Sequence, residues 1–458
     1  MFSTHDSIVA IATPPGRGGI GVVRISGPSS HAIATRILDR RAPLEARYAT
    51  LAHVRATAQE APGGTLDEVV VTFFPAPRSY TGEHVIEISA HGSPVVLQAI
   101  VRAALSAGAR LAEPGEFTLR AFLNGKRDLI QAEAVADLIA AATPLQARVA
   151  FDQLDGTLTQ RIAAIDADLF DLIARLEASL DFPDEGYHFI EPAETGRRVA
   201  AIVEQLDVLL KSAQRGRMIR EGATVVVVGR PNVGKSSIFN ALAGSERAIV
   251  TAIPGTTRDL VSEQVDVEGL AVALVDTAGW HETADVVERE GVARGTRARG
   301  VADLVIVVLD GSQPLTVDDR TLLTETADRR RIIACNKSDL GEGVAGVGES
   351  APFDSVLNVS AKTGDGLDGL RQRIAAALCG SEALRDGAAI SNVRHVELVE
   401  RARAGLCAAQ RAVGLGEAPE EFVLADLQAA RASLEEIAGA RTSEDLLRHI
   451  FETFCIGK

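Results

Sequence analysis

The chain has 458 residues, of which 46% are hydrophobic and 24% charged, and its formal net charge is −15 at pH 7. This length indicates about two to four domains, and the composition is typical of a soluble globular protein. The negative balance excludes a surface that binds nucleic acid through positive charge everywhere, but it is compatible with a local basic groove.

Targeting, membrane and redox signals are weak in this sequence. The longest apolar stretches have the length of strands, so we expect no transmembrane helix and no membrane partner. The first ten residues lack the basic region and apolar core of a signal peptide. Four cysteines, Cys335, Cys379, Cys407 and Cys455, lie far apart without a C-x-x-C motif, which argues against a structural metal site or a disulfide framework. We therefore expect a cytoplasmic protein.

Residues 1–122 predict an α+β domain. Short β-rich runs at 20–25, 68–74 and 84–89 alternate with turns, and the apolar pattern over 94–107 predicts a helix.

Residues 123–217 change to helical spacing and predict the first part of a helical domain. Apolar residues recur at helical intervals over 132–142, 147–180 and 199–212. The segment 181–192 contains Pro and Gly and interrupts the pattern.

Residues 218–380 return to alternating strands and helices, which is typical of a doubly wound α/β domain. The β-rich apolar runs of this region are 224–228, 270–275, 304–309, 331–335 and 356–359.

Residues 381–458 predict the second part of the helical domain, with helices over 393–413, 420–438 and 443–454. Thr442 or Ser443 is the expected N-cap of the last helix. The simplest arrangement is one helical domain, formed by two chain segments, into which the α/β domain is inserted.

The stretch GRPNVGKSS, residues 229–237, matches the phosphate-binding pattern G-x-x-x-x-G-K-[ST]. It lies between a predicted strand and a predicted helix, so backbone N–H groups and the helix dipole would point at one phosphate. Lys235 is expected to reach the β- and γ-phosphates, and Ser236 to ligate Mg²⁺. Such a pattern can also be a chance Gly-rich turn.

Four further motifs follow in the order that a GTPase requires. GTTRD (255–259) offers switch threonines that sense the γ-phosphate, and DTAG (276–279) offers a carboxylate for the Mg²⁺ shell. NKSD (336–339) offers Asp339, which can accept hydrogen bonds from guanine but not from adenine. SAK (360–362) is expected to close over the base.

Together these motifs predict a GTP site in a Ras-like P-loop GTPase domain. The fold class expected is therefore multidomain α/β: an N-terminal α+β domain, a helical domain from two segments, and an inserted GTPase domain. The predicted GTP-binding residues are Asn232, Val233, Gly234, Lys235, Ser236, Ser237, Thr251, Ala252, Ile253, Pro254, Gly255, Thr256, Thr257, Asp276, Thr277, Ala278, Gly279, Asn336, Lys337, Asp339, Ser360, Ala361 and Lys362.

Two residues modify this interpretation. Trp280 follows DTAG, where small Ras-like GTPases place a water-orienting Gln, so hydrolysis must use another residue or a partner, or be slow; Trp280 could equally be a packed switch residue. The side-chain carbonyl of Asn232 could join main-chain oxygens of 251–254 to hold a monovalent cation beside the phosphates. Alternatively, Asn232 only stabilises the loop.

Several blocks of the sequence resemble the tRNA uridine-modification GTPase family MnmE, also called TrmE. They are TPPGRGGIGVVRISG (13–27), YTGEHVIEISAHG (80–92), PGEFTLRAFLNGKRDLIQAEAVADLI (114–139), the GTPase unit and the ending CIGK (455–458). The resemblance extends over essentially the whole chain.

The resemblance implies a homodimer formed through the N-terminal domains and a complex, a heterotetramer, with the FAD-dependent protein MnmG. Together the two proteins would add an aminomethyl or carboxymethylaminomethyl group to C5 of the wobble uridine, position 34, of certain tRNAs. The one-carbon unit would come from 5-formyl- or methylene-tetrahydrofolate, and GTP hydrolysis would drive the cycle.

The resemblance also implies residue roles at the GTP site, where GTPase domains of the family pair in the presence of K⁺. The matching K⁺ ligands are Asn232, Thr251, Ile253 and Thr256; the Mg²⁺ ligands are Ser236 and Thr257. The water-orienting acid matches Glu288 through the family pattern V-E-x-x-G; without the resemblance, Glu288 would be a solvated charge. Trp280 and His281 replace the Leu-Arg that relatives often carry.

For the folate site the resemblance selects Arg24, Glu87, Lys126 and the terminal Lys458, each of which would otherwise be interpreted as a surface charge. A carboxylate can accept hydrogen bonds from the pterin, and the cations can meet its carbonyl or glutamate tail. Cys455 could be a nucleophile toward uracil C6, a redox-active group, or a small residue at a helix end. His91 has no evident partner in the sequence, and we expect it to be structural.

Two functions from different classes remain. The first is an enzyme, a K⁺-activated GTPase of tRNA modification. The second is a GTP-dependent switch that recruits partners in ribosome assembly. A single P-loop and the lack of a recognisable C-terminal RNA-binding unit favour the first.

Overall fold

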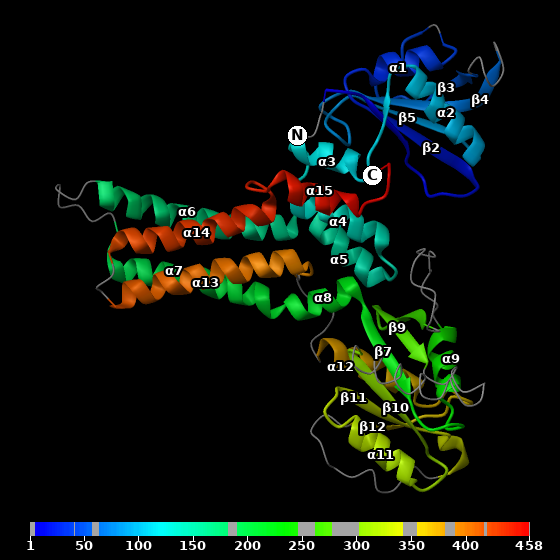
Figure 1. Cartoon of the computed structure of the whole chain (residues 1–458), viewed down its shortest axis with the longest axis vertical. Helices are drawn as coiled ribbons and strands as arrows, with labels where there is room; N and C mark the ends of the chain where they lie inside the picture. Colours follow the sequence, from blue (N-terminus) through cyan, green and yellow to red (C-terminus); the bar gives the residue numbers. More distant parts are fainter. Residues whose placement is uncertain are drawn as a thin grey trace. The chain divides into compact units, whose positions relative to one another are not determined.

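The computed structural model describes residues 5–40, 42–56, 64–181, 190–245, 262–276, 302–341, 355–380, 390–415 and 419–457. The chain separates into two compact units, Met1–Ala136 with Leu434–Lys458, and Asp137–Ser433 (Figure 1). Within the described ranges, no helix combines the length and apolarity needed to cross a bilayer. The boundaries predicted at residues 122, 217 and 380 stay predictions.

The first unit is organised around a six-stranded sheet with strand order β3-β4-β5-β2-β1-β6. Its strands are β1 (Ile8–Ile11), β2 (Gly18–Ser26), β3 (Thr50–Arg55), β4 (Thr65–Phe74), β5 (Val85–Gly92) and β6 (Arg110–Leu111). The β1–β6 pair is parallel, whereas β1–β2, β2–β5, β3–β4 and β4–β5 are antiparallel.

Helices α1 (Ser30–Ile37) and α2 (Pro94–Ser106) contribute to one apolar core with this sheet. Strand residues alternate between buried and exposed along β3, as expected for a sheet with one covered face. The helix predicted over 94–107 is therefore confirmed as α2.

Helices α3 (Glu116–Leu123) and α15 (Glu444–Glu452) also belong to the first unit and contact each other. Gly115, just before α3, has φ +66°, and a side chain there would place Cβ 2.7 Å from the Phe451 carbonyl oxygen. The Oγ of Ser443 accepts a hydrogen bond from the Leu446 N–H at 3.3 Å, so Ser443 is the N-cap of α15. The C-terminal end of the chain is thus held against α3.

The helical part of the chain is formed by two segments, as predicted. Arg431 on the later segment pairs with Asp166 on the earlier one at 3.0 Å, and Gln428 donates to Glu177 at 2.9 Å. The helices are α4 (Leu129–Ala140), α5 (Pro144–Leu154), α6 (Thr157–Asp181), α7 (Pro192–Lys211), α8 (Ala213–Glu221), α13 (Val393–Leu415) and α14 (Glu420–Ala438).

The apolar pattern over 147–180 covers two helices, since α5 ends at Leu154 and α6 begins at Thr157. Gly156 lies between them with φ +93°, a left-handed conformation that breaks the helix.

The α/β part of the second unit is a six-stranded sheet with order β12-β11-β10-β7-β9-β8. All its pairs are parallel except β8–β9. The strands are β7 (Ala223–Val228), β8 (Ser262–Val267), β9 (Leu270–Asp276), β10 (Leu304–Asp310), β11 (Arg331–Asn336) and β12 (Ser355–Asn358).

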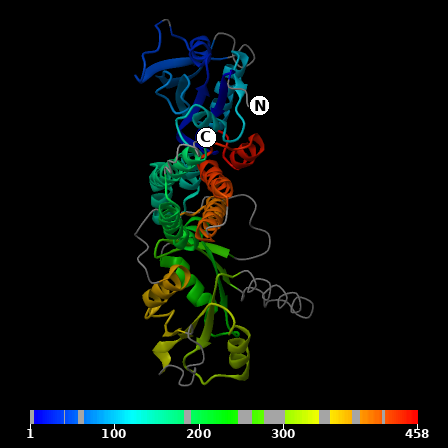
Figure 2. The ribbon, with the colours of Figure 1, turned by 90° about the vertical axis from the view of Figure 1, so that its left-hand side faces the viewer.

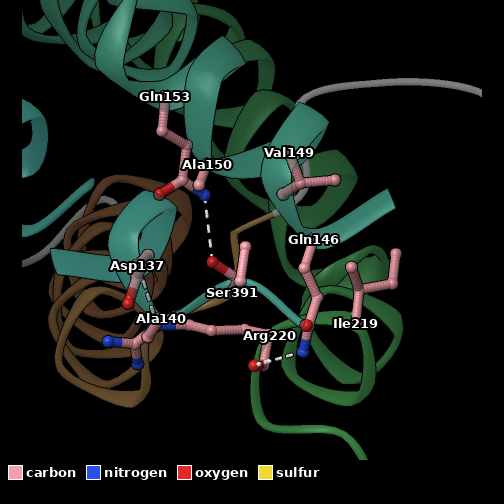
Figure 3. A pocket seen from close by; sticks show the side chains of 10 residues that line it. Asp137, Ala140, Gln146, Val149, Ala150, Gln153, Ile219, Arg220 and Ser391 are labelled. Carbon is pink, nitrogen blue, oxygen red and sulfur yellow. Dashed lines mark hydrogen bonds and ion pairs between the residues drawn. The ribbon is translucent and has the colours of Figure 1, made fainter. Parts of the chain in front are cut away.

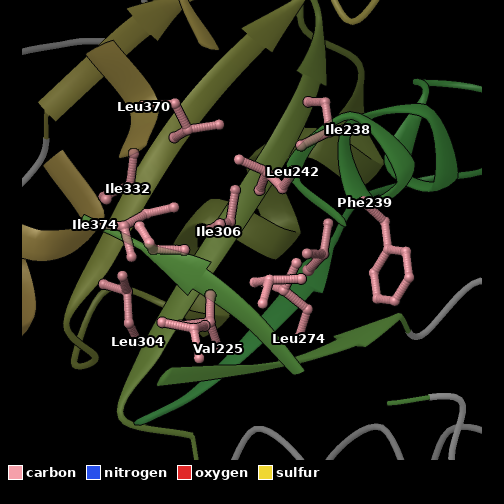
Figure 4. Packing of buried hydrophobic residues seen from close by; sticks show 14 of the residues in the cluster. Val225, Ile238, Phe239, Leu242, Leu274, Leu304, Ile306, Ile332, Leu370 and Ile374 are labelled. Atoms are coloured by element: carbon pink, nitrogen blue, oxygen red, sulfur yellow. The ribbon is translucent and has the colours of Figure 1, made fainter. Parts of the chain in front are cut away.

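Both faces of this sheet are covered. Helices α9 (Lys235–Ser245) and α12 (Leu367–Cys379) pack Leu242 and Ile374 against Ile306 on one face (Figure 4). Helix α11 (Val317–Glu325) covers the opposite face (Figure 2). Burial on both faces explains why the central strands are continuous apolar runs.

One side chain joins the α/β part to the start of α5, and another joins α5 to α8. Thr143 Oγ1 donates to the Gly269 carbonyl in the β8–β9 turn at 2.8 Å, and Gln146 Nε2 donates to the Arg220 carbonyl at 3.1 Å. Beside them is a pocket of about 50 Å³ (Figure 3), bordered by the Arg220–Asp137 ion pair. A volume of this size suits a water molecule rather than a ligand.

Candidate functional site

The P-loop connects the end of β7 to the start of α9. Asn232 has φ +64° and Gly234 φ +95°, conformations that Asn tolerates and Gly favours. A Cβ on Gly234 would lie 2.1 Å from Asn336 Nδ2, and one on Gly229 would lie 2.5 Å from the Val308 carbonyl oxygen. Both glycines are therefore required by close approach, and the N-terminus of α9 points into the loop, as phosphate binding needs.

Asn336 holds three of the predicted motifs together. Its Nδ2 donates to the Val233 carbonyl of the P-loop at 2.9 Å, and its Oδ1 accepts from the Ala361 N–H of the SAK loop at 3.1 Å. The Asn336 side chain is buried, so these hydrogen bonds are shielded from water and fix the spacing of the three loops.

Lys337 adds a second link to the P-loop. Its Nζ donates to the Asn232 carbonyl at 2.9 Å and to Asp310 Oδ2 at 2.7 Å. Burial alone would raise the pKa of the Asp310 carboxyl, but hydrogen bonds from Lys337 and Ser312 outweigh it, and the pKa is lowered. Asp310 ends β10 and was not selected from the sequence, because the DGS stretch matches none of the motifs considered.

The predicted base-recognition residues also lie together. Ser360 Oγ donates to Asp339 Oδ1 at 2.8 Å, and Asp339 itself is exposed. Ser360 is fully buried and receives the Thr363 N–H at 3.2 Å. The Asp339 carboxylate is thereby oriented while its second oxygen faces solvent, where it can accept hydrogen bonds from a base.

The rest of the predicted nucleotide site lies outside the described residues. These are Thr251, Ala252, Ile253, Pro254, Gly255, Thr256, Thr257, Thr277, Ala278, Gly279, Trp280, His281 and Glu288. The backbone of Asp276 is described as the last residue of β9, opposite Val227 of β7. The end of β9 at Asp276 thus lies beside β7, the strand that leads into the P-loop.

The described residues fit a phosphate and a metal in part. The Ser236 and Ser237 side chains are exposed at the first turn of α9, as a magnesium ligand requires. No hydrogen bond joins the Asn232 side-chain amide to another described residue, and both its predicted role as a cation ligand and the alternative that it only stabilises the loop stay predictions. No group of three or more His, Cys, Asp or Glu that could hold a metal exists in the described part of the chain.

The Lys235 side chain is buried in the loop. Its Nζ lies 3.0 Å from the Arg230 carbonyl, to which it donates. Arg230 is itself fixed by an ion pair with buried Asp319 at 3.1 Å. Two side chains thus support the P-loop, Arg230 within it and Asn336 from the NKSD motif.

A second group of candidates meets in the first unit. Arg24 on β2 pairs with Glu87 on β5, with Nη2 and Oε1 at 2.8 Å, because the two residues are direct neighbours in the sheet register. The Arg24 guanidinium also lies 5.1 Å from the Tyr80 ring centre and 5.6 Å from that of Phe117, distances typical of cation–π contacts.

The C-terminal end of the chain completes this site. Arg24 Nη1 donates to the Gly457 carbonyl at 3.4 Å, so residues 433 positions apart in the sequence lie together. Lys458 lies outside the described residues. Lys126 is exposed, and its side chain lies beside Gly82, where an added Cβ would be 3.2 Å from Lys126 Cγ.

Sequence reasoning missed Tyr80, Phe117 and Arg127 as members of this site. The Arg127 guanidinium lies 5.6 Å from the Tyr80 ring centre, so Tyr80 is flanked by two guanidinium groups. Tyr80 begins the YTGEHV block, and its place in that block was the only sequence signal for this residue. Its contacts with Arg24 and Arg127 join segments that are distant in the sequence.

A buried charged cluster supports the Arg24 site. Arg120 is 1% exposed and reaches Asp6 at 2.6 Å, Glu116 at 2.9 Å and Glu83 at 3.2 Å, while Arg110 reaches Glu116 at 2.6 Å. Burial alone would lower the pKa of Arg120, but Glu83, Glu116 and Asp6 outweigh it, and the pKa is raised. The cluster ties α3 to the loop that precedes β5 and to the segment that precedes β1.

Two residues of uncertain role can now be placed. Cys455 is exposed, and its backbone carbonyl accepts from the Gly115 N–H at 3.4 Å. His91 has a partner after all: its Nδ1 lies 2.8 Å from Asp67 Oδ1. The sequence could not reveal this pair, because it forms across neighbouring strands.

The doubly wound sheet, the P-loop between strand and helix, and the cross-links from NKSD and SAK define a P-loop GTPase. Family models match most of the chain: the "GTP-binding protein TrmE N-terminus" over residues 7–126 and the "MnmE helical domain" over residues 129–455.

Full-length relatives show the same. The chain is 46% identical over 461 residues to a "tRNA modification GTPase MnmE" of Koribacter versatilis, with 100% of both chains covered. It is 44% identical over 457 residues to the protein of that name in Chloroflexus aurantiacus, covering 99% of this chain and 100% of the other. The chain therefore belongs to the MnmE family of tRNA modification GTPases.

A solved structure, the G domain of the FeoB iron transporter of T. maritima, aligns with 34% of this chain and 98% of that domain at 28% identity. The TM-score of this alignment is 0.26.

Proposed function

We propose that this chain is a K⁺-activated GTPase that works with an FAD-dependent MnmG partner to modify C5 of the wobble uridine, position 34, of certain tRNAs. The group added is aminomethyl or carboxymethylaminomethyl, with a tetrahydrofolate derivative, 5-formyl or methylene, as the one-carbon donor. The observation that carries the GTPase part is Asn336, which joins the P-loop, the NKSD strand and the SAK loop by two hydrogen bonds.

GTP rather than ATP is the proposed nucleotide because Asp339 is held by Ser360 with one oxygen free for a base. Guanine offers N1–H and a 2-amino group to such an acceptor, and adenine offers neither. Mg²⁺ would be held by Ser236 and Thr257, and it would neutralise charge on the β- and γ-phosphates.

K⁺ activation is proposed because the Asn232 side chain has no hydrogen-bond partner in the described part of the chain, while its backbone is fixed by Lys337. The amide oxygen can therefore act as a cation ligand together with Thr251, Ile253 and Thr256. A cation there would supply positive charge beside the phosphates, and Glu288 would orient the attacking water.

The proposed folate site consists of Arg24, Glu87, Lys126 and Lys458, and the Tyr80 ring would lie against the pterin. Its support is the Arg24–Glu87 pair at 2.8 Å beside that ring. The donor's one-carbon unit would supply the carbon that becomes bonded to C5 of uridine. Homodimerisation through residues 1–122, a cytoplasmic location and the four-segment division at 122, 217 and 380 belong to the same proposal.

Hydrolysis in KCl and in NaCl tests the catalytic proposal. We expect the wild type to be stimulated at least tenfold by K⁺, and Asn232→Gly, which keeps the left-handed backbone, to lose the stimulation but retain GTP binding. Glu288→Ala should abolish turnover, whereas Glu290→Ala should not. Equal rates in the two salts would reject the cation site.

Nucleoside analysis of tRNA from cells lacking the protein tests the biological role. Loss of the C5 modification at the wobble uridine is the expected result. Unchanged wobble uridines would reject it and would favour a GTP-dependent switch in ribosome assembly.

A further inference from the structure

A basic pocket of about 780 Å³ lies in the second unit, away from the nucleotide loops. It is lined by the end of α7, the start of α8, the first residues of β11 and the end of α12. Five of its thirteen lining residues are cationic, against 47 Lys and Arg in the 458 residues of the chain. The five cations of the basic pocket are Lys211, Arg215, Arg330, Arg331 and Arg373.

The basic pocket and the nucleotide site lie at opposite ends of the same strand. β11 begins with Arg331 at the pocket and ends with Asn336 beneath the P-loop. Five residue steps of a strand span roughly 17 Å. A ligand in the basic pocket therefore leaves the nucleotide site open.

The positive charge at the rim of the pocket is not neutralised by the described part of the protein. Lys211, Arg330 and Arg373 are exposed, and none of them forms an ion pair with a described residue. None of the described lining residues is acidic. Like charges gathered in one place destabilise a fold slightly, and an anion bound there would offset that cost.

The other two cations lie deeper. Arg331 is buried and donates to Thr326 Oγ1 at 3.0 Å and to the Leu323 carbonyl, which makes it structural. Arg215 is half-buried near the Cys379 thiol. Burial raises the pKa of that thiol, and the charges on Arg215 and Arg330, which both line the pocket, act in the opposite direction.

We propose that the basic pocket binds the phosphate backbone of tRNA. The inference rests on the proposed function, which makes tRNA the substrate, and on the net charge of −15, which leaves few places for RNA to dock. The lining residues that the structure describes include no aromatic one, so they offer no platform for base stacking, and recognition by them would be independent of sequence. Pockets that enclose small ligands are mostly apolar, whereas this one carries its charges on an exposed rim.

The test replaces Lys211, Arg330 and Arg373 together by Gln in the full-length protein. The control replaces Arg161, Arg320 and Arg411 by Gln; these are also exposed and in the second unit, and the net charge changes equally. Binding of fluorescent tRNA to the GDP-bound protein is followed by anisotropy between 50 and 200 mM salt.

We expect the pocket variant to bind tRNA at least tenfold more weakly at 100 mM salt. The slope of log K against log salt should fall by about three, because each of the three cations removed would neutralise one phosphate. The control should stay within twofold of the wild type. GTP hydrolysis without tRNA should be unchanged in both variants, which shows that they are folded.

Three results would overturn the proposal: equal weakening in both variants, unchanged binding in the pocket variant, or no binding of tRNA by the wild type. Binding of tripolyphosphate is measured as a second experiment. If tripolyphosphate binds the wild type but not the pocket variant, while tRNA binds both equally, the pocket binds a small polyphosphate instead of tRNA. If cells lacking the protein lose the wobble modification but the pocket variant binds tRNA like the wild type, the proposed function is retained and only the assignment of the basic pocket to tRNA is rejected.

Discussion

The nucleotide loops and the site around Arg24 are built in opposite ways. Each nucleotide motif is a continuous stretch, and residues of the motifs themselves, Asn336, Lys337 and Ser360, link one loop to the next. At the other site, single side chains from two strands pair, and one of them, Arg24, also contacts the backbone of Gly457, 433 positions later. A candidate site formed by continuous motifs can therefore be predicted from the sequence, whereas one formed by residues distant in the sequence cannot.

The two sites also differ in how charge supports them. The described part of the nucleotide site has two separate buried carboxylates, Asp310 and Asp319, each paired with one cation. The first unit places Asp6, Glu83 and Glu116 around Arg120, with Arg110 as a second cation. The first unit should consequently be the more sensitive to loss of one charge and to acid.

Replacing Arg120 by Met tests this difference most severely. Removal of one member of a buried ionic cluster leaves carboxylates without their counter-charge and costs about 3–5 kcal/mol. Arg441→Met is the control, since the pair between exposed Arg441 and Glu435 of the same unit should contribute about 1 kcal/mol or less. Urea unfolding, with hydrogen exchange to locate the change in β1 and α3, measures both. Equal losses of stability would show that the cluster is not the main support.

The same cluster predicts a dependence on pH. For both Asp6 and Glu116, burial alone would raise the carboxyl pKa, but hydrogen bonds from Arg110 and Arg120 outweigh it, and the pKa is lowered. A carboxyl with a lowered pKa in the folded state contributes stability that is fully present above its unfolded pKa, about 4. That stability is lost as the pH falls through the lower, folded value. The first unit should thus lose stability below about pH 4 in the wild type.

Much of the fold was predictable because local signals agreed with tertiary packing. The buried strands of the GTPase sheet read as apolar runs, and α2 and α15 carried clear helical patterns. The edge strand β8 (SEQVDV) was missed, since polar residues alternate along it and only its antiparallel pairing with β9 shows that it is a strand. Gly156 was passed over because one glycine in a long apolar pattern is compatible with a helix.

The residues of the candidate sites also differ in whether a local sequence signal could select them. The P-loop, NKSD and SAK residues could be selected from spacing alone, whereas Arg24 and Glu87 were selected only through family resemblance. Asp310 and Tyr80 escaped both approaches, because each acts through a contact with another segment. The cations of the basic pocket come from three chain segments, and no periodicity or motif joins them.

Gly234→Ala should break the nucleotide site while leaving the first unit intact. The new Cβ would lie 2.1 Å from Asn336 Nδ2, and φ +95° disfavours any side chain. Asn336 would have to move, and the three loops would no longer be linked, so we expect GTP affinity to fall by about 100-fold, or about 2.7 kcal/mol. Titration with a fluorescent GTP analogue measures this.

The matched control is Gly244→Ala in α9, where no atom lies within 4 Å of the added Cβ. It should bind GTP like the wild type and be slightly more stable, because Ala is the better helix former by about 1 kcal/mol. If both variants bind normally, the close packing of Gly234 against Asn336 is not needed for nucleotide binding.

Gly457→Ala tests the site around Arg24, and we expect a smaller loss of ligand affinity than in Gly234→Ala. A Cβ at this position would lie 2.2 Å from the Ile11 carbonyl oxygen, and φ is +98°. The C-terminal end must therefore shift away from Arg24 and carry Lys458 with it, and we expect binding of 5-formyltetrahydrofolate to weaken about tenfold, or about 1.4 kcal/mol. Gly108→Ala has the same backbone strain at φ +104° but open space around its Cβ, so it should bind like the wild type in calorimetric titration. GTP binding should be normal in both, because the nucleotide loops belong to the other unit; a loss of GTP affinity in Gly457→Ala alone would mean that the two sites are coupled.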